Sequence, residues 1–402
     1  MRVLLPLHGF VRWNGGLDLI RLITSALTRP AASGQVELHF AFPEATPMQR
    51  VLQTTLRRWR SFRAGNSSTG GSAAALLASA RDLTTGYDVI TCPDTSAGIL
   101  QAASRIDADI VFPSMLPLGK SSQPWIGYLF DFQHRHLPEL FSARTRRNRD
   151  RHFAKIASTA NGIVVNSKHV ALDTVRYLGI SMDRILVMPF APYVHPWWLE
   201  TDPAEAQLRY SIRNPYLLVC NHFWKHKDHA TAFRAFALLR EKRENKDLRL
   251  VLTGDPIDHR DPQHYGRLMD LADSLDIAAH THFLGLIPKR DQISLLRGSK
   301  ALWQPTLFEG GPGGGSTYEA IGLGVPVVLS DIAINREIDR APVIFFRAGN
   351  PGDLAEKTIQ LLRAEPRNVA PRQLLLDSDA SLSRLSVAIV DYLDGFKTRN
   401  SP

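Results

Sequence analysis

Short apolar runs alternate with stretches of helical periodicity along almost the whole chain. In the first half, the apolar runs predict strands at 3–7, 36–42, 88–91, 110–113, 125–130, 162–166 and 185–188. In the second half, the same pattern predicts strands at 216–220, 248–253, 283–284, 301–304, 325–329 and 343–346. Strands that alternate with helices are typical of parallel sheets covered by helices, so we expect an α/β fold.

The segments between these runs repeat apolar residues every three or four positions, which predicts helices. The helices expected in the first half are 16–27, 73–83 and 138–160. Those expected in the second half are 230–240, 265–275, 292–296, 317–323, 354–362 and 382–392. Residues 65–72 are rich in Gly and Ser and predict a loop.

A cluster of prolines separates the two halves, at positions 189, 192, 196 and 203. Proline continues neither a helix nor a strand ladder, so the cluster predicts a hinge between domains. We expect a first Rossmann-like domain at 1–195, a second at 205–380, and a terminal helix at 381–402 that crosses back to the first. Two doubly wound domains that face each other bind their ligand in the cleft, at the carboxyl ends of both sheets.

Length and cysteine usage agree with this picture. A chain of 402 residues is longer than one hydrophobic core usually organises. Cys92 and Cys220 lie far apart in apolar runs, which favours buried thiols in a reducing compartment over a disulfide or a metal site. The opening apolar stretch is short for a signal peptide, and no run reaches the roughly 18 apolar residues of a membrane span. These features predict a soluble, cytoplasmic protein.

Charge is unevenly distributed. The formal net charge is +9, and residues 1–200 hold 22 Lys and Arg against 14 Asp and Glu. This half contains a basic stretch interleaved with aromatic residues: Arg57, Arg58, Trp59, Arg60, Phe62 and Arg63. Such a stretch is either a solvated helix face or a peripheral contact with an anionic membrane. No nucleic-acid-binding pattern accompanies it, so we expect no nucleic-acid partner.

The most informative segment, PTLFEGGPGGGSTYEAIGLGVPVVLSD, covers residues 305–331 and joins a glycine-rich loop to a predicted helix. Exposed backbone N–H groups at a helix N-terminus bind anions. The candidate phosphate-binding positions are Gly313, Gly314, Gly315, Ser316 and Thr317. The carboxylates of Glu309 and Glu319 flank them and are able to accept hydrogen bonds from sugar or ribose hydroxyls. The alternative is a flexible loop with a helix-capping glutamate.

Three further segments follow predicted strands. In NHFWKHKDH, Lys225 and Lys227 are able to hold a diphosphate, although exposed lysines are more often solvated. In DFQHRH, His134 is able to bind a sugar hydroxyl or transfer a proton, although an isolated His is more often structural. The pair Gly15 and Gly16 lacks the dinucleotide fingerprint GxGxxG, and such a pair is usually just a turn.

Together these segments resemble the retaining GT-B glycosyltransferases of glycosyltransferase family 4. That family has a Glu, a glycine-rich turn and a second Glu before a helix and a strand ending in Ser-Asp, as in 309–331 here. Its polysaccharide-building members have an Asp-x-Gln-His…Pro-Glu-x-Phe-Ser segment, matched from Asp131 to Ser142. Nine residues separate the two glutamates here, where the family usually has seven. The resemblance spans nearly the whole chain and is diffuse over 31–120.

The resemblance implies a role for each candidate residue. It assigns Glu309 to the transferred sugar, Glu319 to the nucleotide ribose, and Lys227 to the donor diphosphate. Asn221 stands where the family usually has an Arg, so Lys225 is the local candidate for the second cation. The resemblance also assigns to His134, in the segment that begins at Asp131, a catalytic contact with the donor sugar. Gly15 and Gly16 are expected to approach the donor phosphates or the acceptor.

The reaction implied is retaining transfer of a sugar from a nucleotide-sugar donor to a saccharide or lipid-linked saccharide in cell-surface polysaccharide synthesis. GDP-mannose is favoured as donor, with a UDP-sugar as the alternative. We expect no cofactor, because no Asp-x-Asp metal motif is present and lysines with loop amides would stabilise the leaving diphosphate. The alternatives are a glycoside phosphorylase or nucleotide-sugar epimerase of the same fold, or a two-domain binding protein without catalysis.

Overall fold

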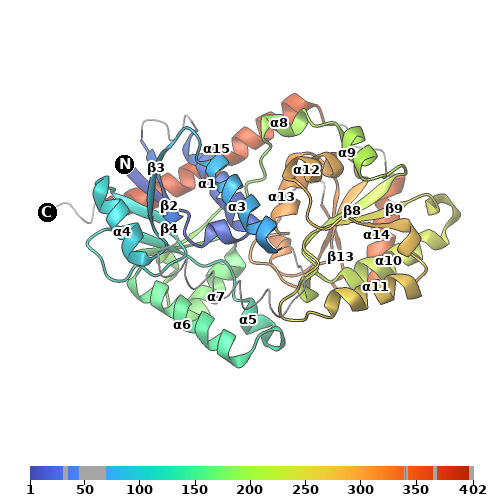
Figure 1. The fold of residues 1–402 in the computed structure, drawn as a ribbon, viewed down its shortest axis with the longest axis horizontal. Coiled ribbons are helices and arrows are strands. Elements are labelled where there is room, and N and C mark those ends of the chain that lie inside the picture. Colours follow the sequence, from blue (N-terminus) through green and yellow to red (C-terminus); the bar gives the residue numbers. More distant parts are fainter. Residues whose placement is uncertain (30–34, 45–68, 339, 341–342, 365–368, 398–402) are drawn as a thin grey trace.

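The computed structural model describes residues 1–29, 35–44, 69–338, 340, 343–364 and 369–397. They form two α/β lobes side by side, with each half of the chain in its own lobe apart from the terminal helix (Figure 1). The basic stretch expected at 57–63 lies outside the described residues, as does the first half of the loop expected at 65–72. The second half of that loop, from Thr69, belongs to a helix.

The first lobe contains a sheet of seven strands in the order β3-β2-β1-β4-β5-β6-β7, and all its pairings are parallel. The strands are β1 (Arg2–Pro6), β2 (Glu37–Glu44), β3 (Asp88–Pro93), β4 (Ile110–Ser114), β5 (Trp125–Tyr128), β6 (Gly162–Val165) and β7 (Ile185–Val187). The helices are α1 (Asn14–Leu27), α3 (Thr69–Leu83), α4 (Ser96–Arg105), α5 (Gln133–His136), α6 (Ala143–Thr159) and α7 (Lys168–Leu178).

The second lobe contains a parallel sheet of six strands in the order β10-β9-β8-β11-β12-β13. Its strands are β8 (Tyr216–Cys220), β9 (Arg249–Thr253), β10 (Thr281–Phe283), β11 (Ala301–Gln304), β12 (Val327–Ser330) and β13 (Val343–Phe346). Its helices are α9 (Pro203–Arg209), α10 (His229–Glu241), α11 (His264–Ser274), α12 (Lys289–Gly298), α13 (Gly315–Gly322) and α14 (Pro351–Arg363). Both strand orders are those of doubly wound Rossmann-like sheets, as the sequence predicts.

The expected strands are all present, but one predicted helix needs correction. The helix expected at 138–160 is broken into a short 3-10 turn, Pro138–Leu140, and α6, because Ser142 is extended and its hydroxyl caps the new N-terminus at Thr145. The proline hinge is not wholly extended, since α8 (Pro196–Leu199) and α9 each begin at a proline. Proline is tolerated in the first helical turn, where its missing N–H leaves no bond unmade.

The terminal helix α15 (Pro371–Lys397) packs on the first lobe, beside α1. Figure 1 shows it running along one side of that lobe towards the carboxyl end of the chain. Leu382, Leu385, Ile389 and Leu393 recur every three or four residues and are buried in the same core as α1. At the far end, the Tyr392 hydroxyl donates to the carbonyl of Arg184 at 2.6 Å. The helix therefore ties the end of the second half of the chain to the first lobe.

Within the described part of the chain, no helix combines the length and the apolar character that a bilayer crossing requires.

Truncation of Leu385 should measure how strongly α15 holds the lobes. The side chain is fully buried, so Leu385→Ala should lower the melting temperature through a loss of about 2–5 kcal/mol. Leu376→Ala on the same helix is the matched control, because Leu376 is 55% exposed. Differential scanning calorimetry of both variants makes the comparison. Equal shifts in the two melting temperatures would show that the α15 contact with the first lobe contributes nothing specific.

Candidate active site

In each sheet the order of the strands reverses at one point, and the loops that follow the two strands there lie side by side. In the second lobe this point is between β8 and β11, which pair directly. The Asn221 amide, just after β8, donates to the Gln304 side chain at the end of β11. Gln304 in turn donates to the Gly313 carbonyl at 2.7 Å and to the Ser316 hydroxyl at 3.1 Å. Asn221 is buried and holds the two loops together through Gln304.

The structure brings two predicted site residues into direct contact. Nζ of Lys227 lies 2.5 Å from Oε1 of Glu309, and both side chains are largely enclosed. A Cβ added at Gly314 would lie 3.3 Å from Oε2 of the same glutamate, so the glycine gives this carboxylate room. Lys225 is exposed, and its backbone N–H is 3.3 Å from the Asp258 carboxylate. Lys227 is therefore the cation that the fold aims at Glu309.

The glycine-rich loop has a conformation that other residues rarely adopt. Gly313 and Gly314 have φ of 69° and 70°, in the left-handed region. The Asn335 side chain accepts from the Gly313 N–H at 2.8 Å, and Thr317 donates back to the Gly313 carbonyl at 2.7 Å. Helix α13 then begins without a side-chain cap, and a Cβ at Gly315 would meet nothing within 4 Å. The helix N-terminus is thus rigid and open, which suits an anion.

Glu319, one helical turn into α13, is bound by groups that the sequence analysis did not identify. Lys289 donates to one carboxylate oxygen, and Gln292 donates to the other at 3.0 Å. Lys289 also lies 3.7 Å from the Asp18 carboxylate of α1, so it bridges the two lobes. Burial opposes its charge, but Asp18 and Glu319 raise the pKa of Lys289. Its sequence context, PKRDQ, gives no sign that would separate it from a solvated lysine.

Gly15 and Gly16 serve a packing role. Helix α1 begins at Asn14, and the Trp13 ring lies against its first turn. A Cβ at Gly15 would lie 2.5 Å from that ring, and one at Gly16 would lie 2.6 Å from the Phe10 carbonyl oxygen. Gly16 is therefore needed for the chain to turn closely into α1, and a side chain at Gly15 would displace the exposed Trp13 ring. Asp18, the partner of Lys289, lies one turn further along the same helix.

In the first lobe, the DFQHRH segment follows β5. Asp131 accepts from Arg149 at 2.5 Å and from the backbone N–H of Gln133 at 2.9 Å, which fixes the turn. His134 is fully buried, and its Nε2 lies 2.9 Å from the Asp150 carboxylate. Burial among phenylalanine rings lowers the pKa of His134. The predicted catalytic imidazole is therefore enclosed in the first lobe, where burial disfavours its charged form.

The two lobes touch at several points around the glycine-rich loop. A Cβ at Gly310 would lie 2.2 Å from the Phe130 carbonyl oxygen, so the loop packs directly on the residue that precedes the DFQHRH turn. Arg260 of the second lobe donates to the Gln133 side chain of the first at 3.2 Å, across the contact surface between the lobes, which we call the seam. The Phe308 ring lies 5.5 Å from the imidazole of His136. Arg260 and His136 were missed from the sequence because neither stands at the family's motif positions.

A second group of contacts across the seam involves α7. The first backbone N–H groups of α7, those of Lys168 and His169, donate to the two carboxylate oxygens of Glu337, each at 2.8 Å. A carboxylate at a helix N-terminus is stabilised by the helix dipole. Glu337, in the Asn-Arg-Glu run after β12, therefore fastens the second lobe to α7.

A surface cavity of about 370 Å³ opens on the first lobe. It is lined by residues of α5 and α6 and the segment between them: His134, Arg135, Pro138, Ala143, Arg146, Arg147 and Asp150. Three of these residues carry a guanidinium group and one carries a carboxylate, and this excess of positive charge favours an anionic ligand.

Residues 204–373 match the family model described as glycosyl transferases group 1. The matched region contains Lys227, Glu309, the glycine-rich loop and Glu319. No curated protein sequence matches the chain.

Solved structures resemble both lobes together. HepE from Anabaena, in complex with UDP and glucose, superimposes with a TM-score of 0.60 at 12% identity over 99% of this chain and 98% of its own. Sucrose-phosphate synthase from Thermosynechococcus elongatus gives 0.62 at 12% identity, over 98% and 94%. WaaG, a glycosyltransferase involved in lipopolysaccharide biosynthesis, gives 0.55 at 14% identity, over 99% and 98%. The chain has a GT-B fold.

The buried histidines near this site predict acid sensitivity. His229, at the start of α10, is fully buried against Phe223, and burial lowers its pKa to about 3. Since the unfolded chain takes up this proton near pH 6.5, stability should fall as pH drops below that value, by about 2 kcal/mol at pH 5 from this group. Melting temperatures of wild type and His229→Gln between pH 7 and 5 should show a weaker decline in the variant. The exposed His259→Gln is the control, and a variant slope equal to wild type would contradict the assignment.

Proposed function

We propose that this protein is a glycosyltransferase that moves a sugar from a nucleotide-sugar donor to a saccharide or lipid-linked acceptor, with retention of anomeric configuration. The observation that carries the proposal is the Lys227–Glu309 pair beside the open N-terminus of α13, within the region similar to group 1 glycosyltransferases. A cation and a ring of backbone N–H groups at one point fit a diphosphate. Glu309 beside them fits the sugar that the diphosphate carries.

When the donor binds, its diphosphate would replace Glu309 as the partner of Lys227. A diphosphate at the N-terminus of α13 brings negative charge to Lys227, which frees the Glu309 carboxylate to accept from sugar hydroxyls. The leaving diphosphate is stabilised by Lys227 and the loop amides, so we propose that transfer needs no metal. The departing phosphate then takes the acceptor proton, as in the front-face displacement of the family that the sequence resembles.

The donor is proposed as a UDP- or GDP-sugar. The polysaccharide-type motif from Asp131 to Ser142 favours GDP-mannose, whereas HepE was solved with UDP-glucose. The ribose of either nucleotide is assigned to Glu319, whose carboxylate is already oriented by Lys289 and Gln292. Gly15 and Gly16 allow α1 to approach this side of the cleft, through Asp18 and Lys289.

The enclosure of His134 changes the role that we propose for it. A fully buried imidazole bound to Asp150 fits a positioning residue, which holds the turn that begins at Asp131 against Gly310. Asp131 is held by Arg149 in the same turn. These two residues would shape the sugar pocket from the first lobe.

Substitution of the two glutamates tests the proposal. Glu319→Gln should chiefly weaken nucleotide binding, by roughly tenfold to a hundredfold, because it loses charge-assisted hydrogen bonds. Glu309→Gln should lower turnover more than affinity for the nucleoside diphosphate, because Glu309 acts where positive charge develops. Calorimetry of UDP and GDP binding, beside donor turnover in excess EDTA, separates the two effects. Glu356→Gln, an exposed residue of α14, is the matched control.

The outcomes also separate the rival functions. Retaining transfer is supported if nucleoside diphosphate is released and NMR shows the same anomeric configuration in the product as in the donor. Phosphorolysis of an oligosaccharide or acceptor-free isomerisation of the donor would replace it with a phosphorylase or an epimerase. Loss of diphosphate binding in Glu309→Gln with normal binding in Glu319→Gln would reverse the two roles. Turnover abolished by EDTA and restored by magnesium would end the metal-independent proposal.

Peripheral membrane contact through the first lobe is the second part of the proposal. Four exposed cations recur every three or four residues on α6, and so form one stripe of the helix: Arg144, Arg147, Arg151 and Lys155. The stripe borders the cavity that Arg135, Arg146 and Arg147 line. A basic stripe beside a basic cavity fits a lipid-linked acceptor presented by an anionic bilayer.

Vesicle binding tests this surface. Replacing Arg144, Arg147 and Arg151 by Ser should weaken sedimentation with anionic vesicles at low salt, by about 1 kcal/mol per cation, and binding should fall as salt rises. Replacing Lys242, Arg243 and Lys246, three exposed cations of the second lobe, removes the same charge elsewhere. Equal loss in the two triple variants would show a response to net charge only. Equal binding to neutral vesicles would contradict an electrostatic contact.

A further inference from the structure

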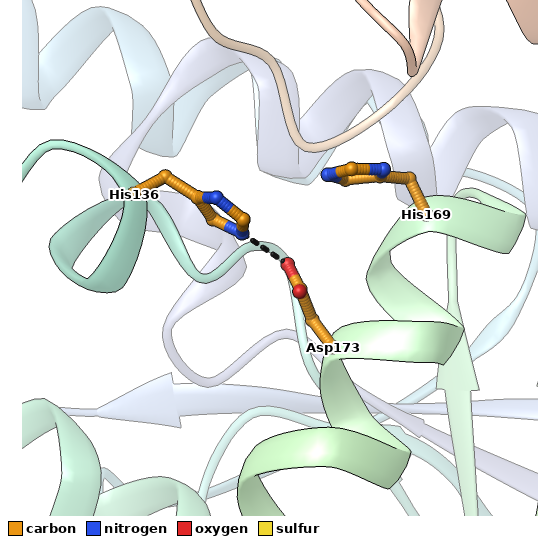
Figure 2. A group of neighbouring side chains, drawn as sticks. All are labelled: His136, His169 and Asp173. Atoms are coloured by element: carbon orange, nitrogen blue, oxygen red, sulfur yellow. Dashed lines mark hydrogen bonds and ion pairs between the residues drawn. The ribbon is translucent and has the colours of Figure 1, made fainter.

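Two histidines and an aspartate converge at the seam between the lobes, apart from the residues assigned to the donor. His136 is the last residue of α5, and His169 and Asp173 belong to α7. Figure 2 shows the His136 imidazole and the Asp173 carboxylate pointing towards each other, with the His169 ring above the same gap. Their ligating atoms all lie within 4.8 Å of one another.

The fold fixes this arrangement from both sides. His169 and Asp173 are four residues apart on α7, so they project from one face of the helix. The Ser167 hydroxyl and the Glu337 carboxylate cap the start of that helix and hold its position. His136 is brought opposite them by the one-turn helix α5.

Hydrogen bonding explains two of the three side chains but not the third. Nε2 of His136 lies 2.6 Å from Oδ2 of Asp173, and this pair would be stable by itself. His169 is not needed for it: within the described part of the chain, its ring nitrogens make no hydrogen bond. Its ring lies 5.5 Å from the His136 ring instead. Two imidazoles and a buried carboxylate this close together are able to bind one cation jointly.

The distances suit a small transition-metal ion. Zinc binds imidazole nitrogen and carboxylate oxygen at about 2.0–2.2 Å in tetrahedral geometry, so donors around it are separated by roughly 3.3 Å. From separations of at most 4.8 Å, each donor atom needs to move by about 1 Å or less, which small side-chain rotations provide. The ion would enter between His136 and Asp173 and replace their direct hydrogen bond.

The donor set also selects the class of ion. Two neutral imidazoles and one carboxylate suit Zn²⁺ and its neighbours Co²⁺ and Ni²⁺, whereas Mg²⁺ prefers oxygen ligands and retains its water. Three protein ligands leave a fourth position for water. We propose that His136, His169 and Asp173 form a binding site for a transition-metal dication, separate from the residues assigned to the donor diphosphate.

A metal ion at this site would stabilise the first-lobe side of the contact between the lobes. All three ligands belong to the first lobe, and His136 packs against Phe308, the residue before Glu309. A bound ion fixes the His136 ring and ties α5 to α7 directly beneath this loop of the second lobe. The proposal does not depend on the proposed function, because it concerns binding alone.

Calorimetric titration of ZnCl₂ into the full chain, free of affinity tag and stripped with EDTA before desalting, tests the site. His169→Asn should lower the affinity of one zinc equivalent by roughly 100-fold or more, since loss even of an outer partner of a metal ligand costs 10- to 100-fold. Asp173→Asn should do the same. His259→Asn, which removes an exposed histidine of the second lobe, should leave that equivalent unchanged. MgCl₂ should give no comparable binding.

Cobalt supplies a readout that folding alone cannot move. Co²⁺ added to the wild-type chain should give the visible absorption bands of a four-coordinate site, and His169→Asn should lose them. Because His169 is half-exposed and makes no hydrogen bond through its ring, this variant should keep the wild-type melting temperature without metal. Zinc affinity and cobalt spectra equal in wild type and His169→Asn would overturn the proposal. So would a loss of equal size in the His259→Asn control.

Discussion

The parallel direction of every strand is the constraint on which the rest of this structure depends. Because all strands of a lobe end at the same edge, the loops after β8 and β11 are forced together, and the chain joins them through Asn221 and Gln304. That bond sets the position of the Gly313 carbonyl, and so of the glycine-rich loop and the start of α13. A polar side chain at this edge is therefore brought to the site by topology, however far apart its neighbours lie in the sequence.

Charge pairing across the same edge gives each of two partly buried lysines an anionic partner. Lys227 pairs with Glu309, and Lys289 pairs with Glu319 and Asp18. Breaking a buried ion pair by removal of one partner costs about 3–5 kcal/mol, because the remaining charge is left uncompensated. An anionic ligand that replaces Glu309 as the partner of Lys227 avoids this cost. The arrangement therefore favours ligands that carry their own negative charge into the cleft.

The sequence predicted the elements well and the contacts between lobes poorly. Strand positions follow from apolar runs, and the functional segment 305–331 was visible because glycines and glutamates at fixed spacing are rare. Three side chains of the second lobe make their contacts with the first lobe: Lys289, Arg260 and Glu337. The sequence around each of them carries no sign of these distant partners. The break at Ser142 was missed because the helical periodicity continues on both sides of it, while a single hydroxyl decides where α6 begins.

His134 and His136 show how two residues of one short segment, DFQHRH, can have opposite environments. A one-turn helix directs side chains two positions apart to different sides, so His134 enters the core beside Phe153 while His136 meets Phe308 of the second lobe. The contact of His136 with Phe308 thus depends on the lobes being together, as do the Gln133–Arg260 bond and the Glu337 cap on α7. If the lobes separate, Gly310 leaves the Phe130 carbonyl and Asp18 leaves Lys289. The candidate site is therefore complete only when both lobes contribute to it.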